Sequence, residues 1–305
     1  MSGIQENVLL ASLTTFWIGG PARFFCIAEN KEEIIEAIGA AREDNLPFFI
    51  LGGGSNLLVA DEGFDGLVLK VQNSKIRVKN EMIEAEGGAT LGEAVAVSLK
   101  AGWLAGLEWA AGIPGTVGGA VCGNASAYGH RMSELVLAVE ILDEKGRVRI
   151  LSNRDCRFGY HESIFKRKPW VILEVNFGLR RGSREESQKL IHQYLEDRQR
   201  RIPPYPSAGS VFKNFEVRGL RPEIRERIPK EKIKGGMVPT GYLIEQCGLK
   251  GKQVGGAKIS DEHANIIVNL GGAKATNVVA LINLCKEKVK EKFGIELEEE
   301  IRFLQ

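Results

Sequence analysis

The chain has 305 residues, of which 44% are hydrophobic and 26% charged, with a formal net charge of +2. This composition is typical of a globular protein with a sizeable core, and the length predicts two or three domains. The near-zero charge and the lack of any apolar run of about 18 residues argue against nucleic-acid binding and a membrane span.

The first quarter of the chain reads as strand, helix, strand and glycine loop. Residues 23–28 predict a strand, and Asn30 followed by Glu33 predicts a capped helix to about residue 43. The strand at 47–51 then leads into Gly52, Gly53, Gly54, Ser55, Asn56 and Leu57. A loop in this place is typical of ligand sites in α/β units, although its spacing matches neither a Rossmann fingerprint nor a Walker loop.

A second glycine-rich stretch, residues 112–129, reads GIPGTVGGAVCGNASAYG and has no charged side chain. Its predicted neighbours are strands at 67–71, 76–78, 82–86, 137–142, 148–151 and 170–179 and a helix at 92–101. Glycine permits positive φ and bare backbone, so such a loop can present N–H groups to a ligand. The alternative is a glycine-rich turn under a crowded core. Two uncharged glycine loops favour a large phosphate-bearing cofactor.

The second half begins with a charged helix at 183–201, whose expected buried stripe is Leu190, Ile191, Tyr194 and Leu195. Prolines within 203–206 end this helix, and we place a domain boundary there. Further elements are predicted at 210–215 (strand), 238–247 (helix), 264–269 (strand), 276–293 (helix) and 297–304 (strand). In the last strand, alternation puts Leu297, Glu299, Ile301 and Phe303 on one face.

Several polar residues could carry chemistry. Ser210, Lys213 and Asn214 offer a hydroxyl and donors, although the stretch also fits an exposed turn, and no GxSxG elbow surrounds Ser210. Glu300 is a candidate acid or electrostatic stabiliser if its face lines a cleft, and otherwise a solvated carboxylate.

Basic and histidine residues give a second set of candidates. Arg198 and Arg201 share a helix face and could bind phosphate, or could simply be solvated. His161, after Tyr160, belongs to a polar and aromatic cluster, and His263 is expected to cap a strand or touch a ligand. The four histidines lack metal-ligand spacing, so no metal is expected. Five scattered cysteines without a CxxC pair, and no signal peptide, favour a reduced, cytoplasmic protein.

Four stretches together resemble one family: LGGGSNLL, GIPGTVGGAVCGNASAYG, PSAGSVFKN and LEEEIRFL. In this order and spacing the chain is similar to the UDP-N-acetylenolpyruvoylglucosamine reductases (UDP-N-acetylmuramate dehydrogenases), in the shorter type II form. The resemblance covers essentially the whole chain. It implies an α+β fold, the FAD-binding fold of the vanillyl-alcohol oxidase type, plus a C-terminal α/β substrate-binding domain. The expected FAD-binding subdomains are 1–70 and 71–202, and 203–305 is the substrate-binding domain, whose last strand could return to the flavin site.

The resemblance also implies a reaction and its residues. NADPH reduces FAD, and UDP-N-acetylglucosamine-enolpyruvate then accepts the hydride to give UDP-N-acetylmuramate for peptidoglycan. Ser210 matches the proton-donating serine and Glu300 the catalytic glutamate. The expected FAD-binding residues are Gly52, Gly53, Gly54, Ser55, Asn56, Leu57, Gly112, Gly115, Thr116, Gly118, Gly119, Asn124 and Ala127. The expected substrate-binding residues are Tyr160, Arg198, Arg201, Lys213, Asn214 and Asn265.

Two positions depart from the family pattern. His161 stands where the family usually has an arginine that helps to stabilise the enolate carboxylate, and imidazole lacks the bidentate fork of guanidinium. If His161 acts as a cation, activity falls as pH rises, and an unchanged His161→Ala variant would exclude the role. Met237 stands where many relatives carry lysine, and Lys234 could compensate. The alternatives are a flavin oxidase of the same fold and a non-catalytic flavin or nucleotide-sugar sensor; a monomer is expected.

Overall fold

The computed structural model describes residues 3–101 and 104–305. The chain forms two compact units, each built from three separate segments. Unit 1 comprises residues 3–8, Ala22–Gly53 and Asp65–Arg198, and unit 2 comprises Leu9–Pro21, Gly54–Phe64 and Gln199–Gln305. No helix in the described part of the chain is long and apolar enough to cross a membrane. The predicted division at residues 70 and 202 stays a prediction.

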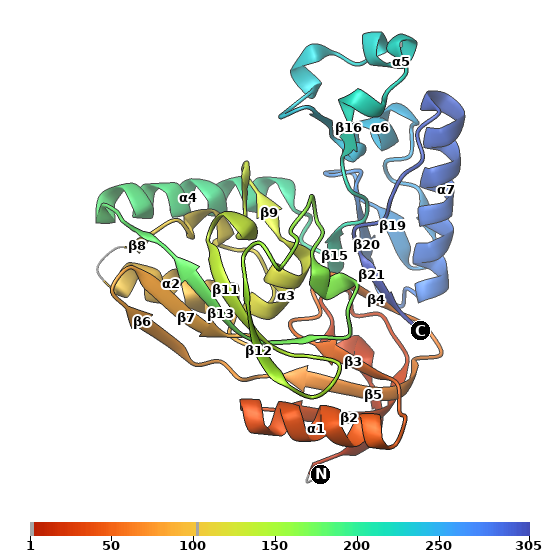
Figure 1. Ribbon diagram of the computed structural model, residues 1–305. Helices are drawn as coiled ribbons and strands as arrows, with labels where there is room; N and C mark the ends of the chain where they lie inside the picture. The colour runs from red at the N-terminus through yellow and green to blue at the C-terminus, as the bar shows by residue number, and fades with distance from the viewer. Residues whose placement is uncertain (1–2, 102–103) are drawn as a thin grey trace. The chain divides into compact units, whose positions relative to one another are not determined.

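The first layer of unit 1 is a sheet packed against helix α1. The strand order is β1 (Gln5–Leu9), β2 (Pro21–Ala28), β5 (Phe64–Val71) and β3 (Phe48–Leu51), and β3 runs parallel to β5. Helix α1 (Lys31–Glu43) starts at Asn30, whose side chain accepts a hydrogen bond from the Glu33 N–H. Its buried residues Ile34 and Ile38 share a core with this sheet, and Figure 1 shows α1 lying along it. The predicted strand–helix–strand pattern is confirmed.

The second sheet of unit 1 is antiparallel, in the order β12-β11-β13-β7-β6. Its strands are β6 (Ile76–Lys79), β7 (Met82–Glu86), β11 (Val136–Leu142), β12 (Val148–Ser152) and β13 (Val171–Gly178). Helices α2 (Leu91–Lys100) and α3 (Val117–Gly123) contribute buried residues to the core of this sheet. Smaller pairs are formed by β8 (Leu104–Ala105) with β14 (Arg180–Arg181), and by β9 (Ser126–Ala127) with β10 (His130–Arg131).

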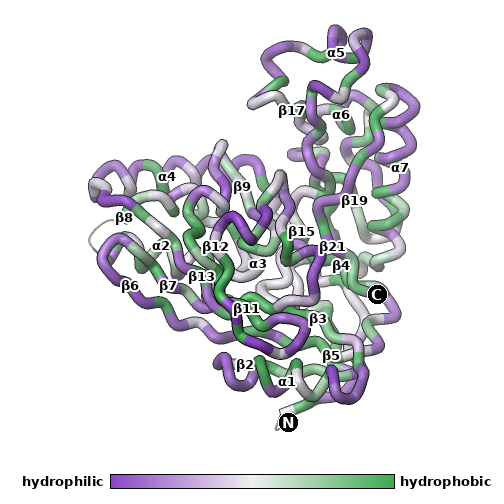
Figure 2. The backbone as a smooth tube through the Cα atoms, viewed as in Figure 1, coloured by the Kyte–Doolittle hydropathy of each residue, from purple (hydrophilic) through white to green (hydrophobic). Residues whose placement is uncertain are grey.

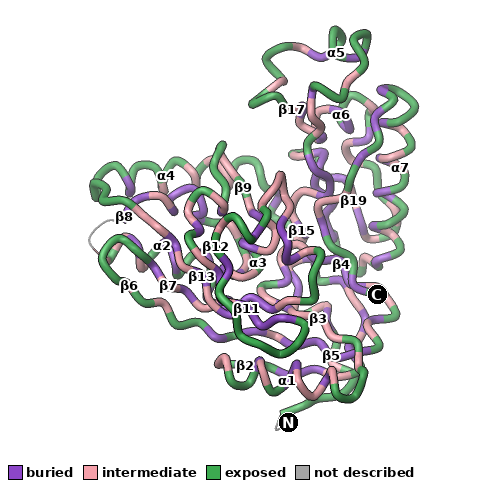
Figure 3. The backbone as a smooth tube through the Cα atoms, in the orientation of Figure 1, coloured by how far each residue is buried: buried purple, intermediate pink, exposed green. Residues whose placement is uncertain are grey.

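Two expectations about unit 1 were wrong. The stretch 112–129 is not loop throughout, because Thr116 caps the N-terminus of α3, and Val117 and Val121 are buried. Helix α4 (Arg184–Arg201) forms as predicted, but its stripe is only half buried: Leu190 is 39% exposed and Leu195 44%. Figures 2 and 3 show α4 as hydrophilic and exposed over much of its length.

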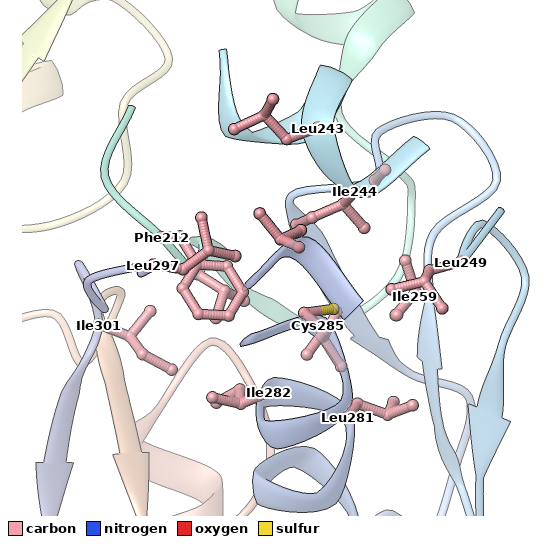
Figure 4. Close-up of a cluster of buried hydrophobic side chains, with 14 of the residues drawn as sticks. Phe212, Leu243, Ile244, Leu249, Ile259, Leu281, Ile282, Cys285, Leu297 and Ile301 are labelled. Atoms are coloured by element: carbon pink, nitrogen blue, oxygen red, sulfur yellow. The ribbon is translucent and has the colours of Figure 1, made fainter. Parts of the chain in front are cut away.

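Unit 2 is built on a sheet in the order β15-β20-β19-β18, with helix α7 packed against it. The elements are β15 (Ser207–Ser210), β16 (Phe215–Glu216), α5 (Pro222–Arg227), β17 (Met237–Val238), α6 (Thr240–Gln246), β18 (Gln253–Val254), β19 (Ala257–Ile259), β20 (Ile266–Asn269), α7 (Ala275–Phe293) and β21 (Arg302–Leu304). Figure 4 shows part of the core, in which Phe212, Ile282 and Ile301 come from widely separated segments.

The C-terminal strand is shorter than predicted. Only β21 is regular, and it pairs in parallel with β4 (Leu57–Val59), a strand from the first quarter of the chain. Upstream of it, Glu299 forms an isolated antiparallel bridge with Phe212. The alternation therefore breaks: Leu297 and Ile301 are buried, as expected, but Phe303 is 41% exposed and Leu304 is buried instead.

Candidate functional site

The two glycine loops touch within unit 1. A Cβ added to Gly53 would lie 2.7 Å from the Cα of Gly115, and one added to Gly52 would lie 2.5 Å from the Thr116 hydroxyl oxygen. Gly115 itself has φ of +120°, a backbone conformation that residues with a side chain rarely adopt. The glycines therefore allow backbone to approach backbone, and the loops that the sequence paired do lie together.

The first loop continues into unit 2 at Gly54. The Gly54 carbonyl accepts a hydrogen bond from the Thr15 N–H at 3.2 Å, and a Cβ on Gly54 would lie 2.4 Å from the Leu13 carbonyl oxygen. The Asn56 side chain donates to the Glu300 carbonyl at 3.2 Å. Asn56 therefore has a contact that the sequence did not predict, with the residue expected to act as the catalytic glutamate.

Short contacts fix the course of the second loop. The Thr116 hydroxyl accepts from the Gly119 N–H at 3.2 Å, and the Gly118 N–H donates to the Gly87 carbonyl at 2.8 Å. A Cβ at Gly118 would come within 2.9 Å of that carbonyl oxygen. At the other end, Ala127 pairs with His130 in a two-residue ribbon.

Asn124 was expected to contact FAD, but its side chain has another role. It is 2% exposed, donates to the Gly159 carbonyl at 2.7 Å and accepts from the Ser133 N–H at 2.9 Å. Asn124 also adopts a left-handed conformation that ends α3. The Asn124 side chain therefore holds the segment that carries Tyr160 and His161, and its expected contact with FAD stays a prediction.

Tyr160 and His161 lie on a tight turn beside α3. Gly159 and Glu162 pair across the turn, and Ser163 donates to the Cys122 carbonyl at 2.6 Å. His161 has φ of +50°, and its Nε2 lies 3.3 Å from the Ser126 hydroxyl oxygen. Its ring meets that of Tyr160 edge-on, with centroids 4.5 Å apart. The structure thus brings His161 to the second glycine loop.

Arg198 also contacts that loop. Its Nε donates to the Gly112 carbonyl at 3.0 Å, and a Cβ at Gly112 would lie 2.8 Å from Leu195. Burial lowers the pKa of the Arg198 guanidinium, and Tyr128 opposes that shift. Arg198 therefore holds the start of the second loop, a contact that the sequence did not predict, and its expected contact with substrate stays a prediction.

In unit 2, short pairing brings the segments of Ser210 and Glu300 together. The Val211 carbonyl accepts from the Glu300 N–H at 2.7 Å, and the Lys213 N–H donates to the Glu298 carbonyl at 2.9 Å. Ser210 is therefore one residue from the position that pairs with Glu300. Nearly ninety positions separate the two residues in sequence, so only the fold could join them.

The neighbouring polar side chains are held in place. Lys213 is 9% exposed, and its Nζ lies 2.5 Å from a carboxylate oxygen of Glu298, a partner that the sequence reading missed. The Asn214 side-chain oxygen accepts from the Thr240 N–H at 3.0 Å. The signal that the sequence offered for the Lys213–Glu298 pair was a lysine just after Ser210 together with the run of acids in the last predicted strand.

Asn265 was expected to bind substrate, and here too the structure gives another role. The side chain is 3% exposed and bonds both backbone groups of Phe212. Arg201 influences the same turn, because burial first and the Arg201 charge second lower the pKa of His263. Asn265 therefore holds the segment that follows Ser210, and its expected contact with substrate stays a prediction.

Met237 lies in a hairpin with Lys234. The two residues exchange both backbone hydrogen bonds across Gly235 and Gly236, at 3.0 and 2.9 Å. Lys234 is therefore the paired neighbour of Met237, and its compensation for a lysine at that position stays a prediction.

The residues of unit 1 fit an FAD-binding site. The contact between the glycine loops leaves backbone where any other residue would place a Cβ. The loops also carry no charged side chain, so amide dipoles would offset the pyrophosphate charge. Among the described residues, no group of three His, Cys, Asp or Glu side chains could hold a metal ion.

Comparisons with known proteins agree with this fit. Residues 22–152 match a family described as FAD binding domain, and residues 201–304 match the C-terminal domain of UDP-N-acetylenolpyruvoylglucosamine reductase. The protein of that name from Solibacter usitatus is 40% identical over 99% of this chain and 96% of its own length. The one from Caldanaerobacter subterraneus is also 40% identical, over 95% of this chain and 90% of its own length.

A solved structure extends the similarity to three dimensions. The crystal structure of the Thermus caldophilus UDP-N-acetylenolpyruvylglucosamine reductase superimposes with a TM-score of 0.79 at 32% identity, covering 99% of this chain and 100% of that one. The fold is thus an FAD-binding α+β fold with the reductase's C-terminal domain, as predicted. Because the identity extends over nearly the full length of both chains, this protein belongs to the UDP-N-acetylenolpyruvoylglucosamine reductase family of FAD-dependent enzymes.

Proposed function

We propose that the chain reduces the enolpyruvyl group of UDP-N-acetylglucosamine-enolpyruvate with NADPH, forming UDP-N-acetylmuramate. The observation that carries the proposal is the pairing of residues 211–213 with 298–300, which brings the Ser210 and Glu300 segments together in unit 2. Family membership supports the substrate and the reductant. With FAD bound, a hydride passes from NADPH to the vinyl CH2 carbon.

The protein's own residues then complete the reduction. Hydride addition leaves an electron pair shared between the α-carbon and the carboxylate, and this charge needs stabilisation. In our proposal Ser210 gives its hydroxyl proton to the α-carbon, and Glu300 is the second acid of the site. Lys213, held beside Glu298, supplies positive charge to the substrate. His161 takes the place of the family arginine at the carboxylate.

The proposal includes a setting for the enzyme. All five cysteines are free thiols, which supports a reducing compartment such as the cytoplasm. We propose a monomer that holds FAD with the glycine loops Gly52–Leu57 and Gly112–Ala127. The side chains of Tyr160, Asn214, Arg198 and Arg201 remain proposed substrate contacts.

Two measurements test the function. Purified protein should be yellow, and it should oxidise NADPH over many turnovers only when UDP-N-acetylglucosamine-enolpyruvate is present. A flavin band without substrate-dependent oxidation would reject the reductase proposal and leave the oxidase alternative. A colourless protein that binds no added FAD would reject both. The same assay with NADH measures the preference between the two reductants.

A further inference from the structure

The segment that carries Ser210 is irregular. Strand β15 pairs with β20 at Ser207 and Ser210, but the register shifts between these two residues. Gly209, within the shift, has φ of +74°. A bulge of this kind re-aims side chains and interrupts the ladder, so the ladder alone does not fix the chain beyond Ser210. Some other contact has to hold residues 211–213.

Asn265 supplies that contact. Its Oδ1 accepts from the Phe212 N–H at 3.0 Å and its Nδ2 donates to the Phe212 carbonyl at 2.8 Å. Its own carbonyl accepts from the Val211 N–H at 2.8 Å. Phe212 is 1% exposed, so water cannot replace these bonds. A carboxamide carries a donor and an acceptor side by side, and here both bind the backbone of one residue.

The clamped segment in turn fixes Glu300. The Val211 carbonyl accepts from the Glu300 N–H at 2.7 Å and from the Ile301 N–H at 3.5 Å. The Asn265 side chain is therefore linked to Ser210 and to Glu300, the two proposed acids, through the backbone of residues 211–212. We propose that Asn265 is a positioning residue that sets Ser210 relative to Glu300 for the protonation step. This inference rests on the proposed function and concerns only residues of unit 2.

The turn before β20 holds Asn265 from behind. The Asn265 N–H points to His263 Nδ1 at 3.3 Å, and the Ser260 hydroxyl accepts from the N–H groups of Glu262 and His263. Asn265 is therefore anchored on the sheet side and reaches toward Phe212. Rigid support of this kind is what a positioning residue requires, because a misplacement of about 1 Å can cost about 100-fold in rate.

Asn269 provides a matched control. It is the last residue of β20, the strand that Asn265 immediately precedes. It is 6% exposed and also bonds backbone, donating to the Phe16 carbonyl and accepting from the N–H groups of Gly271 and Ala273. In the described part of the chain, the bonds of this side chain go to Phe16, Trp17, Gly271 and Ala273, and none goes to residues 210–214 or 298–301. Loss of either carboxamide removes buried hydrogen bonds, and both variants should lose stability. Only Asn265 should affect protonation.

The test compares Asn265→Ala with Asn269→Ala in the FAD-loaded enzyme, following the two half-reactions by stopped flow. In Asn265→Ala, reduction by NADPH should stay near the wild-type rate, while oxidation by UDP-N-acetylglucosamine-enolpyruvate should slow about 100-fold. The solvent deuterium isotope effect on that oxidation should rise, because proton transfer becomes the slow step. Asn269→Ala should keep the wild-type oxidation rate and isotope effect.

A readout without turnover accompanies the kinetics. Amide hydrogen exchange at Phe212 and Glu300 should accelerate in Asn265→Ala and not in Asn269→Ala. If Asn265→Ala does not fold, Asn265→Asp keeps an acceptor for the Phe212 N–H and should show the same effects more weakly. The inference would be overturned if the Asn265 variants were oxidised by substrate at the wild-type rate, or if the Asn269 control slowed equally. Lack of substrate-dependent oxidation in the wild type would overturn the proposed function instead.

Discussion

At the scale of single residues, the site depends both on glycines, which have no side chain, and on asparagine side chains that bind backbone. Gly52 and Gly53 touch Thr116 and Gly115 so closely that one added methyl group would overlap. Asn124 and Asn265, by contrast, use both polar ends of their side chains on backbone. Absent side chains let the two glycine loops touch, and buried amides hold backbone segments in place.

Gly53→Ala should weaken FAD binding strongly. The new Cβ would lie 2.7 Å from the Gly115 Cα, so the two loops must separate. The measurement is the ratio of flavin to protein absorbance after purification, with FAD titration of the apoprotein. Gly39→Ala is the control, because Gly39 lies inside α1 with nothing within 4 Å of the added Cβ. That variant should keep FAD and unfold at an equal or higher temperature. Full flavin content in Gly53→Ala would contradict the proposed role of the two glycine loops in binding FAD.

Side-chain contacts were the part that the sequence could not predict. Asn265 and Asn124 are expected ligand residues by resemblance, and nothing near them in sequence reveals that their amides bond backbone. Those bonds depend on burial and on partners far away in sequence, such as Phe212 for Asn265. The contact between the glycine loops was easier to anticipate, because glycine allows backbone to approach backbone.

At the scale of elements, the turn between β11 and β12 contains a buried, charged carboxylate. Asp143 directly follows β11, and its fully buried carboxylate accepts from the Lys145 and Arg147 N–H groups and from the Arg147 side chain. Burial alone would raise its pKa, but the hydrogen bonds and the Arg147 charge outweigh it and lower the pKa to about 2. The hydrogen bonds of the β11–β12 turn therefore depend on Asp143 being ionised.

Stability should therefore fall in acid in a way that depends on Asp143. The pKa of an unfolded aspartate is about 3.9, so the stabilisation is complete above about pH 4 and is lost as pH falls toward 2. Asp143→Asn should lower the melting temperature by several degrees at pH 7 and flatten its decline in acid. Asp65→Asn is the control, since Asp65 is 85% exposed in its pair with Arg23. Parallel melting curves for wild type and Asp143→Asn across acid would contradict the assignment.

Elements were predictable where local signals agreed. Helix α1 has a capping residue and one apolar face, and it begins at the expected residue. Helix α3 was missed because glycine lowers helix propensity, whereas the Thr116 cap and the burial of Val117 and Val121 override it. The predicted last strand was too long because the segment changes its pairing partner, from Phe212 at Glu299 to β4 at residues 302–304. Alternation of apolar residues does not reveal such a change.

At the scale of the whole molecule, unit 2 is discontinuous in sequence. Phe16 and Leu58 are buried in its core, and Asp61 accepts hydrogen bonds from the Ala275 and Thr276 N–H groups at the start of α7. No local pattern points to these contacts, since more than 200 positions separate the partners. Sequence motifs could indicate the family, but not this interleaving.

A fragment of residues 199–305 should consequently fail to fold alone. It lacks β4, the buried Phe16 and the Asp61 cap, so β21 has no partner and the core has an open side. We expect no cooperative thermal transition and poor dispersion of amide proton resonances. Adding residues 9–64 as a separate peptide should restore part of the structure. A cooperative transition in the fragment alone would contradict the prediction.

The pairing of β21 with β4 also sets an order of events during synthesis. Asn56 and Glu300, which bond beside this pair, are 244 positions apart. The ribosome therefore makes β4 long before its partner strand, and the nascent chain must carry an exposed strand edge in the interval. Such edges recruit chaperones or other chains. We expect yield in cells to depend on chaperone supply and elongation rate more than the stability of the finished enzyme would suggest.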